Sequence, residues 1–539
     1  MMTVQRNLRV ASSNHHETPK APYVDDDNDY PLYKPRDMDA AYTRAGTRHN
    51  MKPEADQDGV WVNISSPSRT LDMSQHVSGT SNSNIAALRT SDSCEGDGEC
   101  FESCIFANLA IPGRGDPVPN AAIGVSKDGT ITFFGPQEEL PVRLSSVHRV
   151  NVGYILPGLW DCHTHFSGLF NTDFPDIVGT HPSTCGALAA RSMYEFLMAG
   201  FTSARDVGSY ALEIAPAINV GWLLGPNIFG AGAAIGITGG SCDACTLPAD
   251  WVYSRQGSDS NSGNPFPGVA HLVLADGVEQ CRLAVRQQIR RGAACIKIVA
   301  SGGVLSRTDD VHSRQYSDEE LRVMIEEAHL QGREVACHAH GKAGIMAAVR
   351  AGATTIEHGS YIDDEAAKLM VSQGVTLVPT RTVAVANLSD LDSLTPETRA
   401  KMIVVAAHQK KAYATAVRHG VKIALGTDIV GVNPHSVSRH GRNGHELAYA
   451  VEAGLTPLQA IEAGTINAAE TLGKQMPKKG LIRVGWDADL IALDENPLEN
   501  IRLFADPNNI KNIWKAGLHV KSKSGQLLWP ISAPKKTFF

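Results

Sequence analysis

The fold is decided by one stretch, Leu156-Pro157-Gly158-Leu159-Trp160-Asp161-Cys162-His163-Thr164-His165-Phe166. Its apolar run, bounded by proline and glycine, predicts a buried strand with two histidines near the end. Residues i and i+2 of a strand point to the same side, so both imidazoles can face one point. Neutral imidazole nitrogens bind zinc at about 2.0–2.1 Å. A lone His-x-His pair also suits two surface histidines, so partners elsewhere in the chain must decide.

Composition limits the class of protein. The chain has 539 residues, 42% of them hydrophobic, and a formal net charge of -8. An acidic balance disfavours nucleic acid, which is bound by basic surfaces. No apolar run is long enough to cross a bilayer, and Met1 to Tyr30 lack the apolar core of a signal peptide. We therefore expect a cytoplasmic protein with neither nucleic-acid nor membrane partners, and secretion stays open.

The chain ends predict accessory parts around a central domain. Residues 1–100 are rich in Ser, Asp and Asn, which is typical of a disordered or loosely attached extension. Residues 101–155 contain short apolar runs and a hairpin signal at Asp128-Gly129. Residues 478–530 return to β character. We expect these two segments to form one small β-sandwich domain, followed by a C-terminal tail at 531–539.

Between them, residues 156–477 alternate strands and helices. Expected strands cover 158–165, 201–207, 227–231, 295–300, 334–340, 355–358, 375–379 and 421–428. Expected helices cover 184–199, 213–219, 278–291, a segment from Ser317, 342–351, 364–373, 395–419, 446–452 and 457–463. Eight strand–helix steps of this kind predict the α/β class and a (β/α)₈ TIM barrel.

Unusual polar residues follow the predicted strands. His338 ends the fifth strand with His340 two residues on, His358 ends the sixth, and Asp428 ends the eighth. Lys297 lies inside the apolar run Ile-Lys-Ile-Val, where a charged amine is costly to bury. Each residue alone has a structural explanation, such as a cap or a hydrogen-bonded core histidine. Together they predict a site at the C-terminal rim of the barrel, where barrel enzymes hold their chemistry.

This set resembles the amidohydrolase superfamily. The segments 157–163, 297–304 and 340–345 are closer still to its ochratoxinase-like branch of metal-dependent amidases and dipeptidase-like carboxypeptidases. The resemblance covers about residues 103–530. It implies two divalent metal ions, of which zinc is the expected kind. One would be held by His163, His165 and Asp428, the other by His338 and His358, with Lys297 carboxylated on its amine and bridging both.

The resemblance also implies a reaction. The expected activity is cleavage of an amide bond to a terminal amino acid, with ochratoxin A-type N-acyl-phenylalanine amides as plausible substrates. Asp428 would act as general base and acid, and His340 would steady the oxyanion. Tyr361 and Arg381 are candidates to bind the substrate carboxylate. Relatives form homo-oligomers, including octamers, so we expect self-association.

The Gly/Ser-rich insertion at 236–268 departs from the family. Relatives carry a Gly-His-Gly-Asp turn after the third strand, where this chain reads Gly239-Gly240-Ser241-Cys242-Asp243-Ala244-Cys245. The departure concerns the loop beside the substrate pocket. A lone Cys242-x-x-Cys245 pair favours a loop over a metal or redox site.

Three alternatives stay open. The chain could be an Xaa-amino-acid dipeptidase or carboxypeptidase, or a cyclic-amide hydrolase of the imidazolonepropionase type. The strand-four lysine disfavours the latter, whose relatives use a single metal. A metal-free assembly protein is the non-enzyme alternative, and filled ligand positions argue against it.

Overall fold

The computed structural model describes residues 103–144, 147–170, 179–243, 245–247, 272–433, 436 and 438–524. The predicted extension at 1–100 and the tail at 531–539 lie outside these residues, as does most of the insertion at 236–268. The following description concerns the described residues alone.

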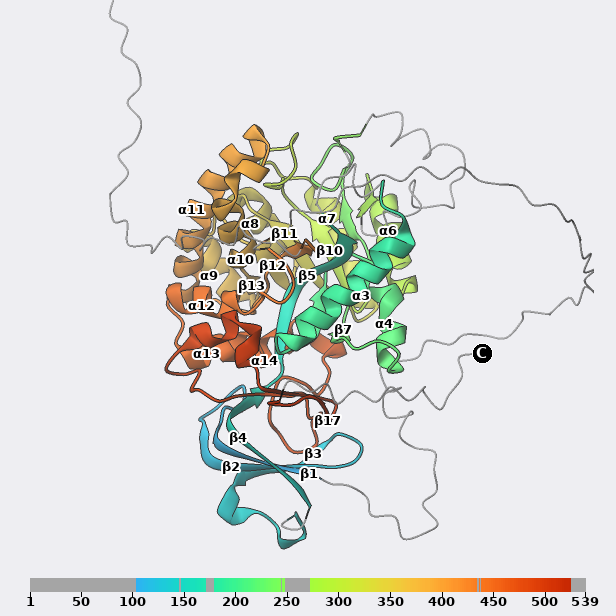
Figure 1. The fold of residues 1–539 in the computed structure, drawn as a ribbon. Helices are drawn as coiled ribbons and strands as arrows, with labels where there is room; N and C mark the ends of the chain where they lie inside the picture. Colours follow the sequence, from blue (N-terminus) through green and yellow to red (C-terminus); the bar gives the residue numbers. More distant parts are fainter. Residues whose placement is uncertain are drawn as a thin grey trace, which may run out of the picture. The chain divides into compact units, whose positions relative to one another are not determined.

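The segments before and after the central domain join in one sheet of seven strands, ordered β17-β16-β15-β4-β1-β2-β3. The strands are β1 Ser103–Ala110, β2 Val118–Val125, β3 Ile131–Pro136, β4 His148–Pro157, β15 Leu490–Leu493, β16 Asn512–Lys515 and β17 Leu518–Lys521. β15 pairs antiparallel with β4. In Figure 1, β1 to β4 and β17 lie together below the helices of the central domain. Ile105, Ile123 and Trp514 fill its core. The two segments therefore meet as predicted, in a single mixed sheet where we expected a β-sandwich.

The central domain is built on two parallel sheets. One has the order β14-β5-β6-β7, and the other the order β13-β12-β11-β10-β8-β9. The first contains β14 Ile429–Gly431, β5 Leu159–Leu169, β6 Phe201–Asp206 and β7 Asn227–Ile228. The second contains β13 Thr376–Val378, β12 Thr355–His358, β11 Glu334–Ala339, β10 Cys295–Val299, β8 Ala234–Gly236 and β9 Leu272–Leu274. The central strands β10, β11 and β12 are almost entirely buried, and β10 is correspondingly apolar except at Lys297.

The segment 421–428 connects the two parallel sheets. Leu377 N donates to Lys422 O at 2.8 Å, and Cys162 N donates to Leu425 O at 2.8 Å. The predicted strand at 421–428 is nevertheless wrong, since only an isolated bridge at Ile423 precedes β14. The reason is that its peptide groups bond to several neighbours in turn, including Ala463 O and the Asp161 carboxylate, so no continuous ladder forms.

Helices alternate with the parallel strands, as the sequence indicates. They are α3 Pro182–Met198, α4 Ala211–Asn219, α6 Val278–Arg290, α7 Asp318–Leu330, α8 Lys342–Ala351, α9 Asp364–Gln373, α10 Arg381–Ser389, α11 Pro396–Arg418, α12 His445–Glu452, α13 Pro457–Ala463 and α14 Ile466–Glu470. Helix α7 begins after Ser317, as predicted, and Ser317 forms a capping box with Glu320. Helices α8 and α9 end at left-handed glycines, Gly352 and Gly374. Helix α10 was not predicted.

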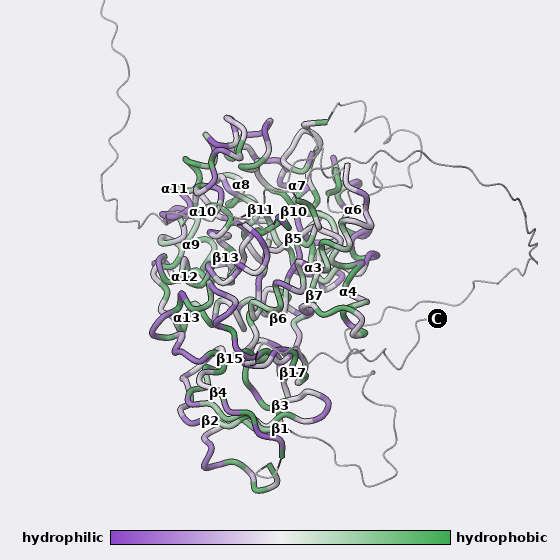
Figure 2. Tube along the Cα trace, viewed as in Figure 1, coloured by the Kyte–Doolittle hydropathy of each residue, from purple (hydrophilic) through white to green (hydrophobic). Residues whose placement is uncertain are grey.

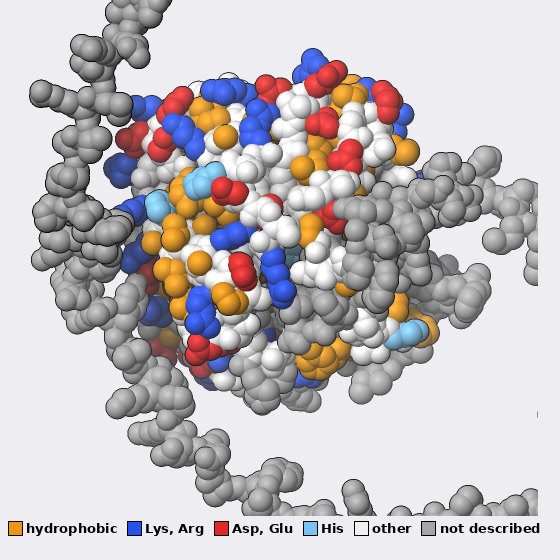
Figure 3. All heavy atoms as spheres, turned by 90° about the horizontal axis from the view of Figure 1, so that it is seen from above, with side chains coloured by type: hydrophobic (Ala, Val, Ile, Leu, Met, Phe, Trp, Pro, Cys, Tyr) orange, Lys and Arg blue, Asp and Glu red, His pale blue; other side chains and the backbone are white. Residues whose placement is uncertain are grey.

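The helices are amphipathic, with hydrophobic and hydrophilic residues interleaved along their traces (Figure 2). Their buried faces join one large core with the parallel strands, including Phe196, Ile298 and Ile356. On the face seen in Figure 3, hydrophobic side chains lie beside acidic and basic ones. Of the helices in the described ranges, none combines the length and hydropathy needed to cross a membrane.

Candidate active site

Two histidines of β5 direct their Nε2 nitrogens toward one carboxylate. His165 Nδ1 lies 2.8 Å from the carbonyl oxygen of Gly208 and must donate to it. His163 Nδ1 donates to Glu357 Oε2 at 2.7 Å. In their neutral forms, each Nε2 therefore carries a lone pair. These two nitrogens lie 3.2 Å and 3.5 Å from Asp428 Oδ1, so three electron-pair donors converge on one point.

Lys297 of β10 reaches the same point from the other sheet. Its Nζ lies 3.2 Å from His163 Nε2, and the residue is buried. Burial lowers the pKa of its amine. Burial acts to raise the pKa of Asp428, but His163 and His165 outweigh it and hold that pKa well below its usual range. The carboxylate is thus kept ionised among the imidazoles.

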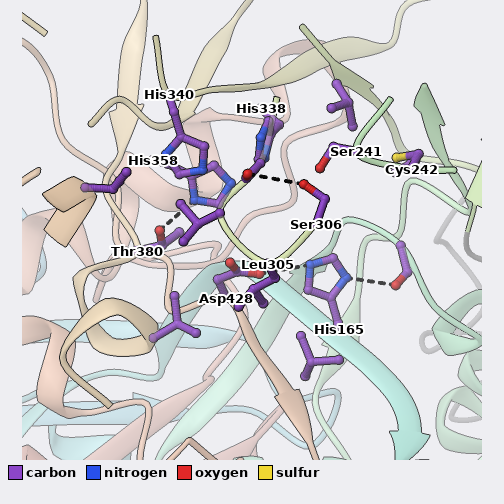
Figure 4. A pocket seen from close by; sticks show the side chains of 18 of the residues that line it. His165, Ser241, Cys242, Leu305, Ser306, His338, His340, His358, Thr380 and Asp428 are labelled. Atoms are coloured by element: carbon purple, nitrogen blue, oxygen red, sulfur yellow. Dashed lines mark hydrogen bonds and ion pairs between the residues drawn. The ribbon is translucent and has the colours of Figure 1, made fainter. Parts of the chain in front are cut away.

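Three further histidines form a second group. Ligand atoms of His338, His340 and His358 all lie within 4.8 Å of one another. Figure 4 shows these imidazoles together on one side of the cavity, opposite His165 and Asp428. Burial lowers the pKa of His338 to about 3, so its ring is neutral at pH 7. His340, which we expected to contact the oxyanion, thus belongs geometrically to a trio of candidate ligands.

Hydroxyl groups orient two of these rings. His340 Nδ1 lies 2.8 Å from Ser360 Oγ, and His358 Nδ1 lies 2.8 Å from Thr380 Oγ1. A second possible ligand group combines His163, His358 and Asp428. His358 therefore connects the two groups. Such outer contacts fix the ring orientation and basicity of metal-ligating histidines.

Sequence reasoning missed a buried ion pair behind the site. Glu357 on β12 binds His163 through Oε2 and the Arg205 guanidinium, on β6, through Oε1 at 2.7 Å. Both charged side chains are at most 1% exposed. Burial acts to raise the pKa of Glu357, but Arg205 and His163 outweigh it and hold that pKa far below its usual range. The sequence did offer a signal for this pair, because each of the two charged residues lies inside a buried strand.

Asp161 is a second missed residue. Its carboxylate accepts from Thr427 Oγ1 at 2.6 Å, Asn443 Nδ2 at 2.8 Å and the His163 backbone N at 3.0 Å. Burial raises its pKa to about 6 despite these bonds. These contacts attach Thr427, the residue before Asp428, to β5. They therefore position Asp428, the candidate general base.

A cavity of about 280 Å³ opens onto the site. It is lined by the six predicted metal ligands and His340, which are His163, His165, Lys297, His338, His340, His358 and Asp428. Apolar side chains from β10, α10 and α11 and the loop after β10 form another wall, including Val304, Leu305, Val383, Met402 and Val405. The structure thus brings together every residue predicted to hold metal or carry out catalysis.

The two predicted carboxylate-binding residues lie elsewhere. Arg381 donates through Nη1 to Ala406 O at 2.7 Å, and Tyr361 packs its ring 4.5 Å from the His312 ring. Neither is among the described residues that line the cavity. Their expected role in substrate binding has no support from this placement.

The loop at 239–245, whose sequence differs from the family pattern, contributes Ser241 and Cys242 to the cavity wall. Cys242 is buried, and burial raises the pKa of its thiol to about 12. Neither Cys242 nor Cys245 is in a disulfide. A protonated thiol is a poor metal ligand or nucleophile, which agrees with the interpretation of this pair as part of a loop.

Comparisons of the sequence and of the structure with known proteins identify the same kind of relative. The model of the amidohydrolase family matches residues 154–520. Ochratoxinase of Aspergillus niger is 45% identical over 430 residues, covering 78% of this chain and 86% of that protein. Its crystal structure superposes with a TM-score of 0.74 at 43% identity, covering 81% of this chain and 99% of that one. The crystal structure of a Xaa-Pro dipeptidase with bound methionine superposes with a TM-score of 0.68 at 31% identity. This match covers 78% of this chain and 100% of that one.

The matched region contains the whole cavity described above, from His163 to Asp428. The chain therefore belongs to the amidohydrolase family and is a hydrolase of amide bonds.

Proposed function

We propose that the protein is a binuclear metal-dependent amidohydrolase that releases a terminal amino acid from an N-acyl amino acid. The main observation that supports this proposal is that four histidines, Lys297 and Asp428 line one cavity. We further propose that the two parallel sheets and segment 421–428 form a (β/α)₈ barrel at 156–477, which would gather these residues at one rim.

The donor set fits divalent cations. The Nε2 atoms of His163 and His165 lie 3.5 Å and 3.2 Å from one carboxylate oxygen of Asp428, and their electron pairs repel one another unless a proton or a cation lies between them. The neighbouring trio is neutral and clustered. His163, His165 and Asp428 would hold one ion, and His338 and His358 the other. Zinc suits these nitrogen and oxygen donors.

Lys297 fits as a bridge once it is carboxylated. Carbon dioxide would add to the neutral amine, whose pKa burial lowers, with loss of one proton. The product replaces a buried cation by an anion with two oxygen donors. A charged amine 3.2 Å from an imidazole nitrogen would instead repel any metal there.

When bound, a metal pair supplies an activated water near neutral pH and polarises the scissile carbonyl. The chain's own part is proton transfer and orientation. Asp428, kept ionised, accepts the water proton and returns it to the leaving amine. His340 can donate to the oxyanion only if its Nδ1 accepts from Ser360; the opposite tautomer would make it a ligand.

The apolar wall supports a hydrophobic substrate. Val304, Leu305, Met402 and Val405 offer an aromatic or aliphatic group a surface beside the reacting centre. N-acyl-phenylalanine amides of the ochratoxin A type fit this chemistry. The likeness to a Xaa-Pro dipeptidase supports Xaa-amino-acid dipeptides as a second substrate class.

The test combines metal analysis with a substrate panel. Purified protein is expected to contain about two metal ions per chain and to hydrolyse N-acyl-phenylalanines faster than Xaa-Pro dipeptides or cyclic amides. Lys297→Met should lose metal and activity, while Lys342→Met, which changes a surface ion pair on α8, should lose neither. Metal-free wild-type protein with full amidase activity would refute the proposal.

Three further parts remain proposals of ours. The domain at 101–155 and 478–530, built on the seven-stranded sheet, would support the barrel through the β4–β15 pairing. The molecule would self-associate, with an octamer as one expected form. The protein would act in the cytoplasm. Light scattering and cell fractionation test the last two.

A further inference from the structure

We infer that Arg307 binds the terminal carboxylate of the substrate and so makes the enzyme selective for amides that end in a free α-carboxylate. This inference rests on the proposed function. It replaces the expected role of Arg381, whose guanidinium binds the backbone of α11 at Ala406.

The charges that line the cavity leave few candidates for this role. Its described wall carries two cationic side chains, Lys297 and Arg307, and two carboxylates, Asp243 and Asp428. Lys297 is buried against His163 and belongs to the catalytic centre. Arg307 is exposed, and no carboxylate among the described residues pairs with its guanidinium. It is therefore the lining cation that can accept a new anionic partner.

The loop that carries Arg307 is held in shape from both sides. Lys401 of α11 donates to Gly303 O at 3.2 Å, Ser306 O at 2.8 Å and Asp309 O. Asp309 Oδ2 accepts from Gly303 N at 3.0 Å. Arg307 lies between these fixed points, so its backbone is positioned before any ligand binds. Such preorganisation lowers the entropy cost of binding.

The neighbours of Arg307 complete a subsite of matching chemistry. Ser306 and Thr308 flank it in sequence and line the same wall. The Ser306 hydroxyl donates to Gly303 O and to the Asp309 carboxylate, which helps to hold the loop in place. Leu305, two residues away, lies in the cavity between Asp428 and Ser306 in Figure 4. An amino acid would therefore meet a cation and an apolar surface together. A guanidinium suits this task because its fork matches both carboxylate oxygens.

The experiment compares two substrates that differ only in charge, an N-acyl-L-phenylalanine and its C-terminal amide. Wild-type holoenzyme is expected to prefer the acid. In Arg307→Gln, the ratio of kcat/KM for the acid to that for the amide should fall about 10- to 100-fold, mainly through KM. Arg307→Lys should restore part of the preference. Arg350→Gln, at the end of α8, is the matched control and should leave the ratio unchanged.

Calorimetric binding of L-phenylalanine and its amide gives a second readout that needs no turnover. Arg307→Gln should weaken binding of the amino acid and not of its amide. Equal losses for acid and amide, or an unchanged ratio, would overturn the inference while leaving the hydrolase intact. Wild-type protein that cleaves neither compound would refute the proposed function itself, and the inference with it.

Discussion

Replacement of Glu357 by glutamine should weaken both folding and metal binding. The carboxylate joins the Arg205 guanidinium and His163 Nδ1, each at 2.7 Å, with all three side chains at most 1% exposed. Glutamine keeps the shape but removes the charge. Arg205 is then buried without a counterion, and breaking a buried pair in this way costs about 3–5 kcal/mol. We expect a loss of unfolding free energy of that order.

The same change should also reverse the tautomer of His163. The glutamine oxygen is held by the cationic Arg205, so its amide NH₂ faces His163 Nδ1. That nitrogen must then accept, which puts the ring proton on Nε2, toward Lys297 and Asp428. A protonated Nε2 cannot ligate a metal. Losing an outer contact of this kind costs about 10- to 100-fold in metal affinity.

The assay measures thermal or denaturant unfolding and metal affinity on the same variants. Arg205→Met combined with Glu357→Gln removes the stranded cation and frees the glutamine oxygen to accept from His163 Nδ1, so both stability and metal affinity should largely recover. Glu327→Gln is the control, since its partner Arg286 is 58% exposed and such pairs contribute at most about 1 kcal/mol. A Glu357→Gln protein with wild-type stability and full metal content would refute this reasoning.

Three other predictions concern catalysis, metal and pH. Asp428→Asn should lower kcat by at least about 10²-fold with little change in melting temperature, and unchanged turnover would remove the residue from the mechanism. A strong chelator should lower the melting temperature, and added zinc should restore it, since ligands of the folded state stabilise it; an unaffected melting curve and activity would argue against bound metal. Burial lowers the pKa of Lys515 to about 8 from 10.5, so the folded state binds fewer protons between these values and stability should rise with pH across that window. Lys515→Met should be more stable than wild type by about 3 kcal/mol at pH 7, with the gap shrinking toward pH 10.5; a gap that does not change with pH would contradict the assignment.

The sequence singled out the candidate residues that line the cavity because those residues violate local expectation. A lysine in Ile-Lys-Ile-Val, or a histidine at the end of an apolar strand, needs a partner of its own. The same argument applies to Arg205 and Glu357, which also interrupt buried strands. They were missed because no functional pattern drew attention to them, although the physical signal was equal.

Side-chain direction after a strand end could not be predicted. Arg381 follows β13 at the expected rim, yet it begins helix α10, which turns its guanidinium onto α11. Segment 421–428 shows the same limit, because its backbone bonds to β13, to β5 and to Ala463 in succession. Both outcomes depend on neighbours distant in sequence, which periodicity does not report.

Backbone strain links the fold to the site. In the described part of the chain, five non-glycine residues have positive φ, and three of them, His358, Thr380 and Asp428, line the cavity. They follow or end β12, β13 and segment 421–428, at φ values of 70°, 54° and 60°. Such conformations cost about 1–3 kcal/mol each and persist only where the surroundings impose them. A left-handed residue reverses the direction of its side chain relative to a continuing strand. Strain at these three neighbouring positions therefore explains how His358 and Asp428 turn toward His163 rather than outward.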